Sequence, residues 1–426
     1  MSQTVTGQAV TGQAGTGRTP SVLFRAEPFR LQNAGVVYAF LLIVLFFTLA
    51  TTITGRPFYL SALNTANILD QAAPVAILAV FMTICLISGN FDLSIGATGA
   101  LSAGLTLTIL NHSGLGISLT AGILCGIAMG LLNGVLVQVV GVNAFIVTLG
   151  TLTAIRGLLD ILTNGESIET SKSGLSDLLV GVYPLNLRWW SVAAAALLAA
   201  AGVVSVRRAR RGLSSRVAGP LLLVTGLVVA VIALLFFPTY WPLNKQVYIL
   251  FVIVAVSWVV LQFTAVGRRV YAVGGNAEAA RLSGIAVARY RIVPFVLNGA
   301  AAALVGILYA ARFHAVNPNA LSGIELTVLA AAILGGTSLF GGAGSVVKTL
   351  IGALILFVLA NGFSVLNLGG NYQDLIKGVV IIGAATIYVL AGKRGSRTIR
   401  GSGGGAKAAA PASTTGESTA DSRVKA

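Results

Sequence analysis

The sequence predicts an all-α, polytopic helical membrane protein with about twelve transmembrane helices, and at least ten. The chain of 426 residues is 56% hydrophobic and only 9% charged, and its mean hydropathy is +0.90, whereas soluble domains carry about 25% charged residues. Apolar runs of about 20 residues recur along the chain, each long enough to cross about 30 Å of hydrocarbon. The short alternating segments of about 10 residues that build a β-barrel are not visible in the sequence.

Twelve candidate spans follow one another along the chain. They lie near 34–53, 67–88, 93–111, 117–140, 144–162, 189–206, 217–238, 246–265, 290–312, 325–340, 346–368 and 374–391. Three of these runs (93–111, 144–162 and 325–340) are short or carry polar residues, which are costly in hydrocarbon. Either 93–111 or 325–340 could therefore be a re-entrant segment instead of a full crossing.

Positive charge sets the expected orientation, because short cytoplasmic loops are enriched in Lys and Arg. With twelve spans and both termini in the cytoplasm, 20 of the 28 Lys and Arg residues fall on the cytoplasmic side. They lie in the N-terminal tail, the loops 207–216 and 266–291, and the tail that begins at Lys393. The enrichment of Lys and Arg on the cytoplasmic side explains the net charge of +16. No nucleic-acid partner is therefore expected.

The two ends of the chain are expected to be disordered cytoplasmic tails. Residues 1–33 are rich in Thr, Gly and Gln, residues 393–426 are rich in Gly, Ala and Ser, and neither has a periodic apolar face. The transmembrane domain therefore extends over residues 34–392.

The sequence shows no motif for covalent chemistry. It has no phosphate-binding loop, no zinc-protease motif and no nucleophile elbow. Cys85 and Cys125 lie inside predicted spans and are expected to be small packing residues, with no metal-ligand spacing around them. We expect no catalytic residue, no metal and no cofactor on this chain, so uphill movement of a solute would need an ion gradient or a partner.

One apolar run carries a stripe of glycines. Gly122, Gly126, Gly130 and Gly134 recur every four residues and share one face of the predicted helix. In lipid, small residues on one face let two helix backbones approach closely. Tight packing inside one bundle is the favoured interpretation, and a dimer seam is the alternative.

The most charged passage between two apolar regions is the 266–291 loop. The residues 277–282, AEAARL, are strong helix formers, and Gly284 is a typical residue at a helix end. A short charged helix at the membrane surface can dock in another protein and transmit its movement to two spans. The alternative is an ordinary solvated loop.

This loop resembles the coupling loop of ABC importer permeases, whose pattern is E-A-A, three residues, Gly, and a closing Ile/Leu-Pro element. Here Glu278-Ala279-Ala280 is followed by Gly284 and by Ile292-Val293-Pro294. Four longer segments are similar to the ribose/xylose-type monosaccharide permease family. They are VYAVGGNAEAARLSGI (270–285), SGNFDLSIG (88–96), NAFIVTLGTLTAIRGL (143–158) and AILGGTSLFGGAGSVVKTLIGALIL (332–356). The two extra spans before the loop are more typical of the D-xylose permeases than of the ribose permeases.

The resemblance implies an ABC importer permease fold in a bacterial cytoplasmic (inner) membrane. It implies a permease homodimer, separate ATP-binding subunits that hold ATP and Mg²⁺, and an extracytoplasmic sugar-binding protein. The residues expected to couple to the ATPase are Gly275, Asn276, Glu278, Ala279, Ala280, Arg281 and Gly284.

Polar residues in or beside the spans are the candidates for the translocation path. They are Asn90, Asp92, Ser94, Asn133 and Asn361. Each could equally hydrogen-bond a neighbouring helix. Three alternatives remain open: an ion-coupled secondary carrier, an ABC permease for a non-sugar solute such as a nucleoside, and a scaffold or receptor without transport. The acids Asp92 and Glu325 lie near span ends, which gives the ion-coupled carrier little support.

Overall fold

The computed structural model describes residues 31–210 and 240–367, a few single positions between 223 and 234, and residues 378–379. The chain divides into two units, Met1–Gly35 and Val36–Ala426, and the packing described below belongs to the second. The predicted tails, apart from residues 31–33, which are helical, and the predicted spans near 217–238 and 374–391 lie outside the continuously described ranges.

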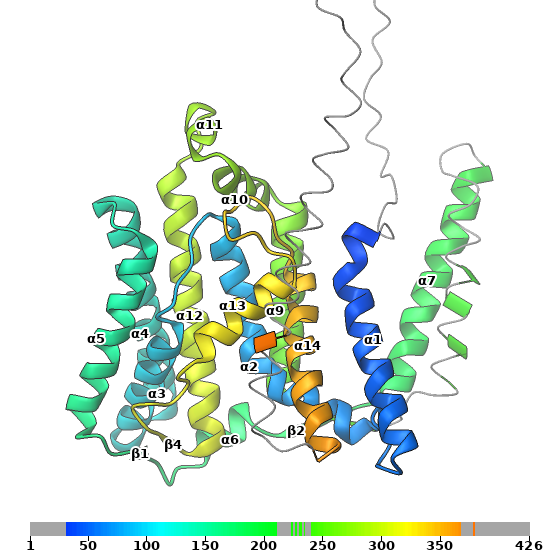
Figure 1. Ribbon diagram of the computed structural model, residues 1–426, viewed down its shortest axis with the longest axis horizontal. Helices are drawn as coiled ribbons and strands as arrows, with labels where there is room; N and C mark the ends of the chain where they lie inside the picture. Colours follow the sequence, from blue (N-terminus) through cyan, green and yellow to red (C-terminus); the bar gives the residue numbers. More distant parts are fainter. Residues whose placement is uncertain are drawn as a thin grey trace, which may run out of the picture. The chain divides into compact units, whose positions relative to one another are not determined.

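The described part of the chain is built from helices that run between two ends of the unit (Figure 1). The helices are α1 (Leu31–Ile53), α2 (Ala62–Ile87), α3 (Ile95–His112), α4 (Leu115–Val135), the π-helical turn η1 (Leu136–Val140), α5 (Ala144–Thr163), α6 (Gly174–Leu179), α7 (Leu187–Arg210), α9 (Lys245–Phe263), α10 (Ala265–Gly275), α11 (Ala277–Leu282), α12 (Val287–Phe313), α13 (Ile324–Leu334) and α14 (Val346–Val365). Among the described residues, seven helices are long and apolar enough to cross a membrane: α1, α2, α4 with η1, α5, α9, α12 and α14. The predicted polytopic helical class is therefore confirmed, whereas the number twelve stays a prediction.

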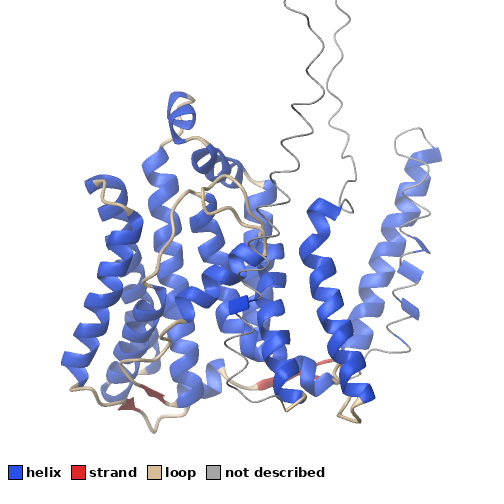
Figure 2. Ribbon diagram, in the orientation of Figure 1, coloured by secondary structure: helices blue, strands red, loops and turns tan. Residues whose placement is uncertain are grey.

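The strands in the described ranges form two short antiparallel ribbons. β1 (Ile168–Glu169) pairs with β4 (Ala315–Val316), and β2 (Val182–Leu185) pairs with β3 (Trp241–Asn244). Figure 2 shows all of them at one end of the helices, opposite α10 and α11. We call these two ends the strand end and the α11 end.

Helix α2 lies at the centre of the largest apolar core. Most of its side chains are buried, and the run from Ala76 to Val80 has no exposed surface, as expected for a stretch of helix that is apolar on every face. It packs against α9, α12, α13 and α14. One polar contact in this core joins Thr83 Oγ1 to Thr349 Oγ1 of α14 at 2.7 Å.

The glycine stripe of α4 lies against α12 and α3. A Cβ atom at Gly126 would lie 2.3 Å from the Gly299 carbonyl oxygen, and one at Gly130 would lie 2.3 Å from that of Phe295. At the two ends of the stripe, a Cβ at Gly122 would meet Thr106, and one at Gly134 would meet Ile292. The four glycines thus allow α4 to approach α12 more closely than any side chain would permit.

Helix α13 is shorter than the predicted span 325–340. Its eleven residues rise about 16 Å, too little to cross a bilayer. The chain nevertheless passes from Val316, paired at the strand end, to Gly342, whose N–H donates to the Ile87 carbonyl at the other end of α2 (2.9 Å). Residues 316–342 therefore pass along the unit as one helix flanked by irregular backbone, a segment that we call the interrupted span. Within hydrocarbon, irregular backbone is stable only where protein surrounds it.

The segment before α3 is also irregular. Gly89 lies beside Arg291, where a Cβ would be 3.7 Å from Nη2, and Asp92 adjoins Asn298. Arg291 and Asn298 are seven residues apart on α12, which corresponds to about 10 Å along the helix axis. Residues 89–92 therefore descend along α12 into the bundle. The short, mostly buried helix α3 then completes the passage to the strand end.

Candidate functional site

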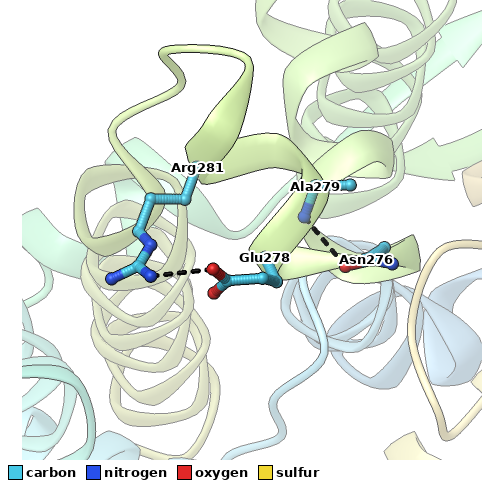
Figure 3. Close-up of polar contacts among 4 residues, drawn as sticks. All are labelled: Asn276, Glu278, Ala279 and Arg281. Atoms are coloured by element: carbon cyan, nitrogen blue, oxygen red, sulfur yellow. Dashed lines mark hydrogen bonds and ion pairs between the residues drawn. The ribbon is translucent and has the colours of Figure 1, made fainter.

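The charged loop contains the short helix that the sequence predicts. Helix α11 begins after Asn276, whose Oδ1 accepts a hydrogen bond from the Ala279 backbone N–H at 3.0 Å (Figure 3). This contact satisfies one of the free donors at a helix start. The helix ends at Leu282, and Gly284, two residues further on, adopts φ +80°, a left-handed conformation that glycine adopts without strain.

The outer surface of α11 carries an ion pair. Arg281 Nη2 donates to Glu278 Oε1 at 2.8 Å, and the two side chains are 70% and 64% exposed (Figure 3). Pairs this exposed contribute about 0–1 kcal/mol to stability. Ala280 faces inward and is buried, while Leu282 on the same short helix is 80% exposed. The helix therefore presents both charges and one apolar side chain outward, where a partner can reach them.

Helix α10, which carries α11, is held tightly to the bundle. A Cβ at Gly274 would lie 1.6 Å from the Ile87 carbonyl oxygen and 2.8 Å from the Gly342 nitrogen. Tyr271 Oη donates to the Gly344 carbonyl at 2.8 Å, and burial raises the pKa of this phenol, so it remains a donor. A Cβ at the neighbouring Gly275 would meet only the Gly342 Cα, at 4.0 Å. Movement of α10 therefore acts directly on the end of α2 and on the loop before α14.

Three of the five path candidates meet in a buried polar cluster at the start of α3. Asp92 Oδ1 accepts hydrogen bonds from Ser94 N (2.9 Å), Ser94 Oγ (2.6 Å) and Asn133 Nδ2 (3.4 Å). Asn133 Nδ2 also donates to Ser94 Oγ at 2.9 Å. All three residues are at most 1% exposed. This cluster, which joins α4 to the segment before α3, holds helices together and is closed to solute in this conformation.

Asn298 belongs to the same cluster, although the sequence did not single it out. It is fully buried on α12, and both polar atoms of its side chain lack a hydrogen-bond partner in the described part of the chain, as do Asn133 Oδ1 and Asn90 Nδ2. Buried polar groups of this kind are ordinarily satisfied by ordered water. The signal was present in the sequence, because Asn298 is a polar residue well inside the span 290–312.

The remaining two candidates lie apart from one another. Asn361 on α14 exchanges two hydrogen bonds with Asn64 on α2, at 2.9 and 3.1 Å, near the strand end. Asn90, 6% exposed, lies in the irregular segment before α3. The structure therefore does not bring the five predicted path residues together in one channel.

A second polar group, at the strand end, joins three helices. Asp70 on α2 forms an ion pair with Arg312 on α12, Nη1 to Oδ2 at 2.9 Å. Gln246 at the start of α9 donates to the Asp70 carbonyl oxygen at 2.8 Å and also to its Oδ1. The predicted topology already placed Asp70 and Arg312 on the same side of the membrane, but their pairing depends on how the helices pack.

The chain matches a family model described as branched-chain amino acid transport system / permease component over residues 64–385. It is 36% identical to the xylose transport system permease protein XylH of Escherichia coli (strain K12) over 361 residues, which are 83% of this chain and 90% of that protein. It is 33% identical to the ribose import permease protein RbsC of the same organism over 350 residues, 81% of this chain and 92% of that protein. XylH of Haemophilus influenzae is 33% identical over 380 residues, 86% of this chain and 98% of that protein.

No solved structure is a significant match to the chain. The matches to the permeases nevertheless extend over most of the chain, and the residues matched by the family model include all four segments that carried the resemblance in the sequence. The chain therefore belongs to the branched-chain amino acid transport system / permease component family, and within it to the ribose/xylose-type monosaccharide ABC transporter permeases.

Proposed function

We propose that this chain is the transmembrane subunit of an ATP-binding cassette importer for a monosaccharide, with xylose or ribose as the expected cargo. The observation that carries the proposal is α11, a capped, outward-facing charged helix, in a chain whose relatives are named as xylose and ribose permeases. The sequence of this helix resembles the coupling loop of ABC importer permeases, which supports the proposal.

Energy reaches the permease through a separate ATP-binding subunit docked on α11. That subunit holds ATP and Mg²⁺, and this chain supplies the docking surface with Asn276, Glu278, Arg281 and Gly284 and the transmembrane path. When the subunits close on ATP, they displace α11 and α10. Because α10 contacts Ile87 and Gly342 without intervening side chains, the displacement passes to α2 and to the interrupted span. Such a two-state movement alternates access between the two sides of the membrane.

The same proposal places α11 and both termini in the cytoplasm of a bacterium and the strand end outside the cytoplasmic membrane. The distribution of Lys and Arg supports this orientation. A sugar-binding protein then delivers its ligand to the strand end, and a second copy of the permease completes the path.

Uptake into proteoliposomes tests the cargo and the energy source together. The vesicles contain the permease, its ATP-binding subunit and its binding protein, and the solutes are radiolabelled D-xylose, D-ribose, a nucleoside and leucine. We expect uptake of one of the two sugars that requires ATP and survives an ionophore. Uptake that does not require ATP and is abolished by the ionophore would establish an ion-coupled carrier. Uptake of leucine or the nucleoside without either sugar would show that the cargo is wrong.

A further inference from the structure

Two adjoining cavities lie at the strand end on either side of one polar wall. The larger, about 310 Å³, lies between α2, α9, α12 and α14, and its lining includes Gln71, Gln246, Tyr309, Arg312 and Phe357. The smaller, about 150 Å³, lies against α6 and the start of α9. Gln246 and Arg312 line both cavities. We call the larger one the inner cavity, and its volume is within the range of small-molecule sites.

Hydrogen bonds to Asp70 hold the polar wall in place. Arg312 Nη1 and Gln246 Nε2 both use Asp70 as their acceptor, and Asp70 is only 7% exposed. Among the described residues, no hydrogen bond engages Gln246 Oε1, Arg312 Nε or Arg312 Nη2. Gln246 and Arg312 therefore bring to the lining of the inner cavity one acceptor and guanidinium donors that no described residue uses.

Aromatic rings form another part of the lining. The Tyr309 and Phe313 ring centroids are 4.6 Å apart with the rings tilted by 45°, and Phe313 lines the inner cavity beside Tyr309. Phe357 approaches from α14, and the remaining lining is largely aliphatic. Apolar walls with a few convergent polar groups are typical of small-ligand sites.

This combination selects for a neutral ligand that has both donors and acceptors. The charges of Asp70 and Arg312 already compensate each other, so the wall has no net charge that would favour an anion or a cation. A polyol can instead donate a hydroxyl to Gln246 Oε1, accept from Arg312, and place its C–H face on Phe357. We infer that the inner cavity is a transient monosaccharide subsite within the permease, an assignment that rests on the proposed function.

Site-specific labelling tests this assignment in the intact complex of the permease with its ATP-binding subunit. Tyr309→Cys is introduced in a Cys85→Ala, Cys125→Ala background, and its rate of reaction with a maleimide is measured. Ser173→Cys, exposed at the strand end outside the inner cavity, is the matched control. We expect millimolar D-xylose or D-ribose to slow labelling of the Tyr309→Cys variant several-fold and to leave the control unchanged. Leucine should have no effect on either variant.

Gln246→Leu, added to the Tyr309→Cys variant, tests the contact between Gln246 and the ligand. The labelling rate without sugar reports any structural effect of losing the hydrogen bonds to Asp70. The labelling rate without sugar should stay the same, while protection should require about tenfold more sugar, as for one lost hydrogen bond. Protection by leucine alone, protection of both cysteine variants alike, or sugar protection unaffected by Gln246→Leu would each overturn the subsite. If no sugar protects although the proteoliposomes take sugar up, the subsite is wrong and the proposed function stands.

Discussion

Arg312 at the end of α12 lies 2.9 Å from the carboxylate of Asp70 on α2. The Asp70 side chain is 9% exposed and that of Arg312 is 40% exposed, so the pair is neither a surface ion pair nor a fully buried one. It fixes the strand ends of two helices whose other ends lie near α10, where we expect the ATPase to act.

Arg312→Gln should destabilise the permease by about 2 kcal/mol. This value lies between the 0–1 kcal/mol of an exposed pair and the 3–5 kcal/mol lost when one partner of a buried pair is removed. The reason is that the nearly buried Asp70 carboxylate would lose its counter-ion. Thermal unfolding of the purified complex measures the effect. The double variant Asp70→Asn, Arg312→Gln should recover part of the loss, and simple additivity of the two changes would contradict a direct interaction.

Gly126→Ala should lower stability by about 1–3 kcal/mol, the usual cost of overpacking. The added Cβ would lie 2.3 Å from the Gly299 carbonyl oxygen and 2.6 Å from the Ala303 Cβ, so α4 and α12 must separate. Gly116→Ala in the same helix is the control, because nothing lies within 4 Å of its Cβ position. That change should be neutral or stabilising by up to about 1 kcal/mol. Equal unfolding temperatures for the two variants would refute the close approach.

Gly274→Ala should uncouple ATP hydrolysis from transport. Its Cβ cannot be accommodated 1.6 Å from the Ile87 carbonyl oxygen, so α10 must shift away from α2. Gly116→Ala, whose added Cβ has nothing within 4 Å, is again the control. We expect uptake per ATP hydrolysed to fall steeply in the first variant and to remain near wild type in the second. The account fails here if the second variant is impaired as much as the first.

Asn276→Ala should weaken α11 by about 1 kcal/mol, because the Ala279 N–H loses its acceptor. A frayed helix transmits less displacement, so the uptake rate should fall while the amount of permease in the membrane stays constant. Asn276→Asp keeps an oxygen in the same place and should retain most of the activity. Uptake assays alongside quantitative immunoblots make the comparison, and equal activity of all three proteins would show that the cap is dispensable.

The features that could be predicted from the sequence are those set by short-range patterns. The apolar runs located the seven long helices, and AEAARL with Gly284 predicted α11, because propensity and a glycine stop act within one turn of helix. The four-residue glycine spacing predicted close packing on one face of α4. Its partner, α12, could not be read from spacing, since which helices meet depends on the whole bundle.

The candidate path was harder to predict, because the sequence does not show which residue a polar side chain in a span will contact. Asp92, Ser94 and Asn133 meet, but Asn361 instead pairs with Asn64. Gln246 was missed because a polar residue at the first turn of a span looks like an ordinary helix end. Its importance comes from Asp70, a residue far away in sequence. The predicted span 325–340 was longer than α13, because a hydropathy pattern does not show that the glycines at 335 and 336 end the helix.

ATP-dependent sugar uptake by Glu278→Arg, compared with Glu166→Arg, tests the central claim most directly. Both glutamates are exposed and both changes alter the charge equally, but Glu166 lies at the end of the bundle opposite α11. The account predicts that Glu278→Arg abolishes uptake and co-purification of the ATP-binding subunit, while Glu166→Arg leaves both intact. Uptake that persists in Glu278→Arg with the ATP-binding subunit still bound would contradict the account, and α11 would then be only a charged turn at the membrane surface.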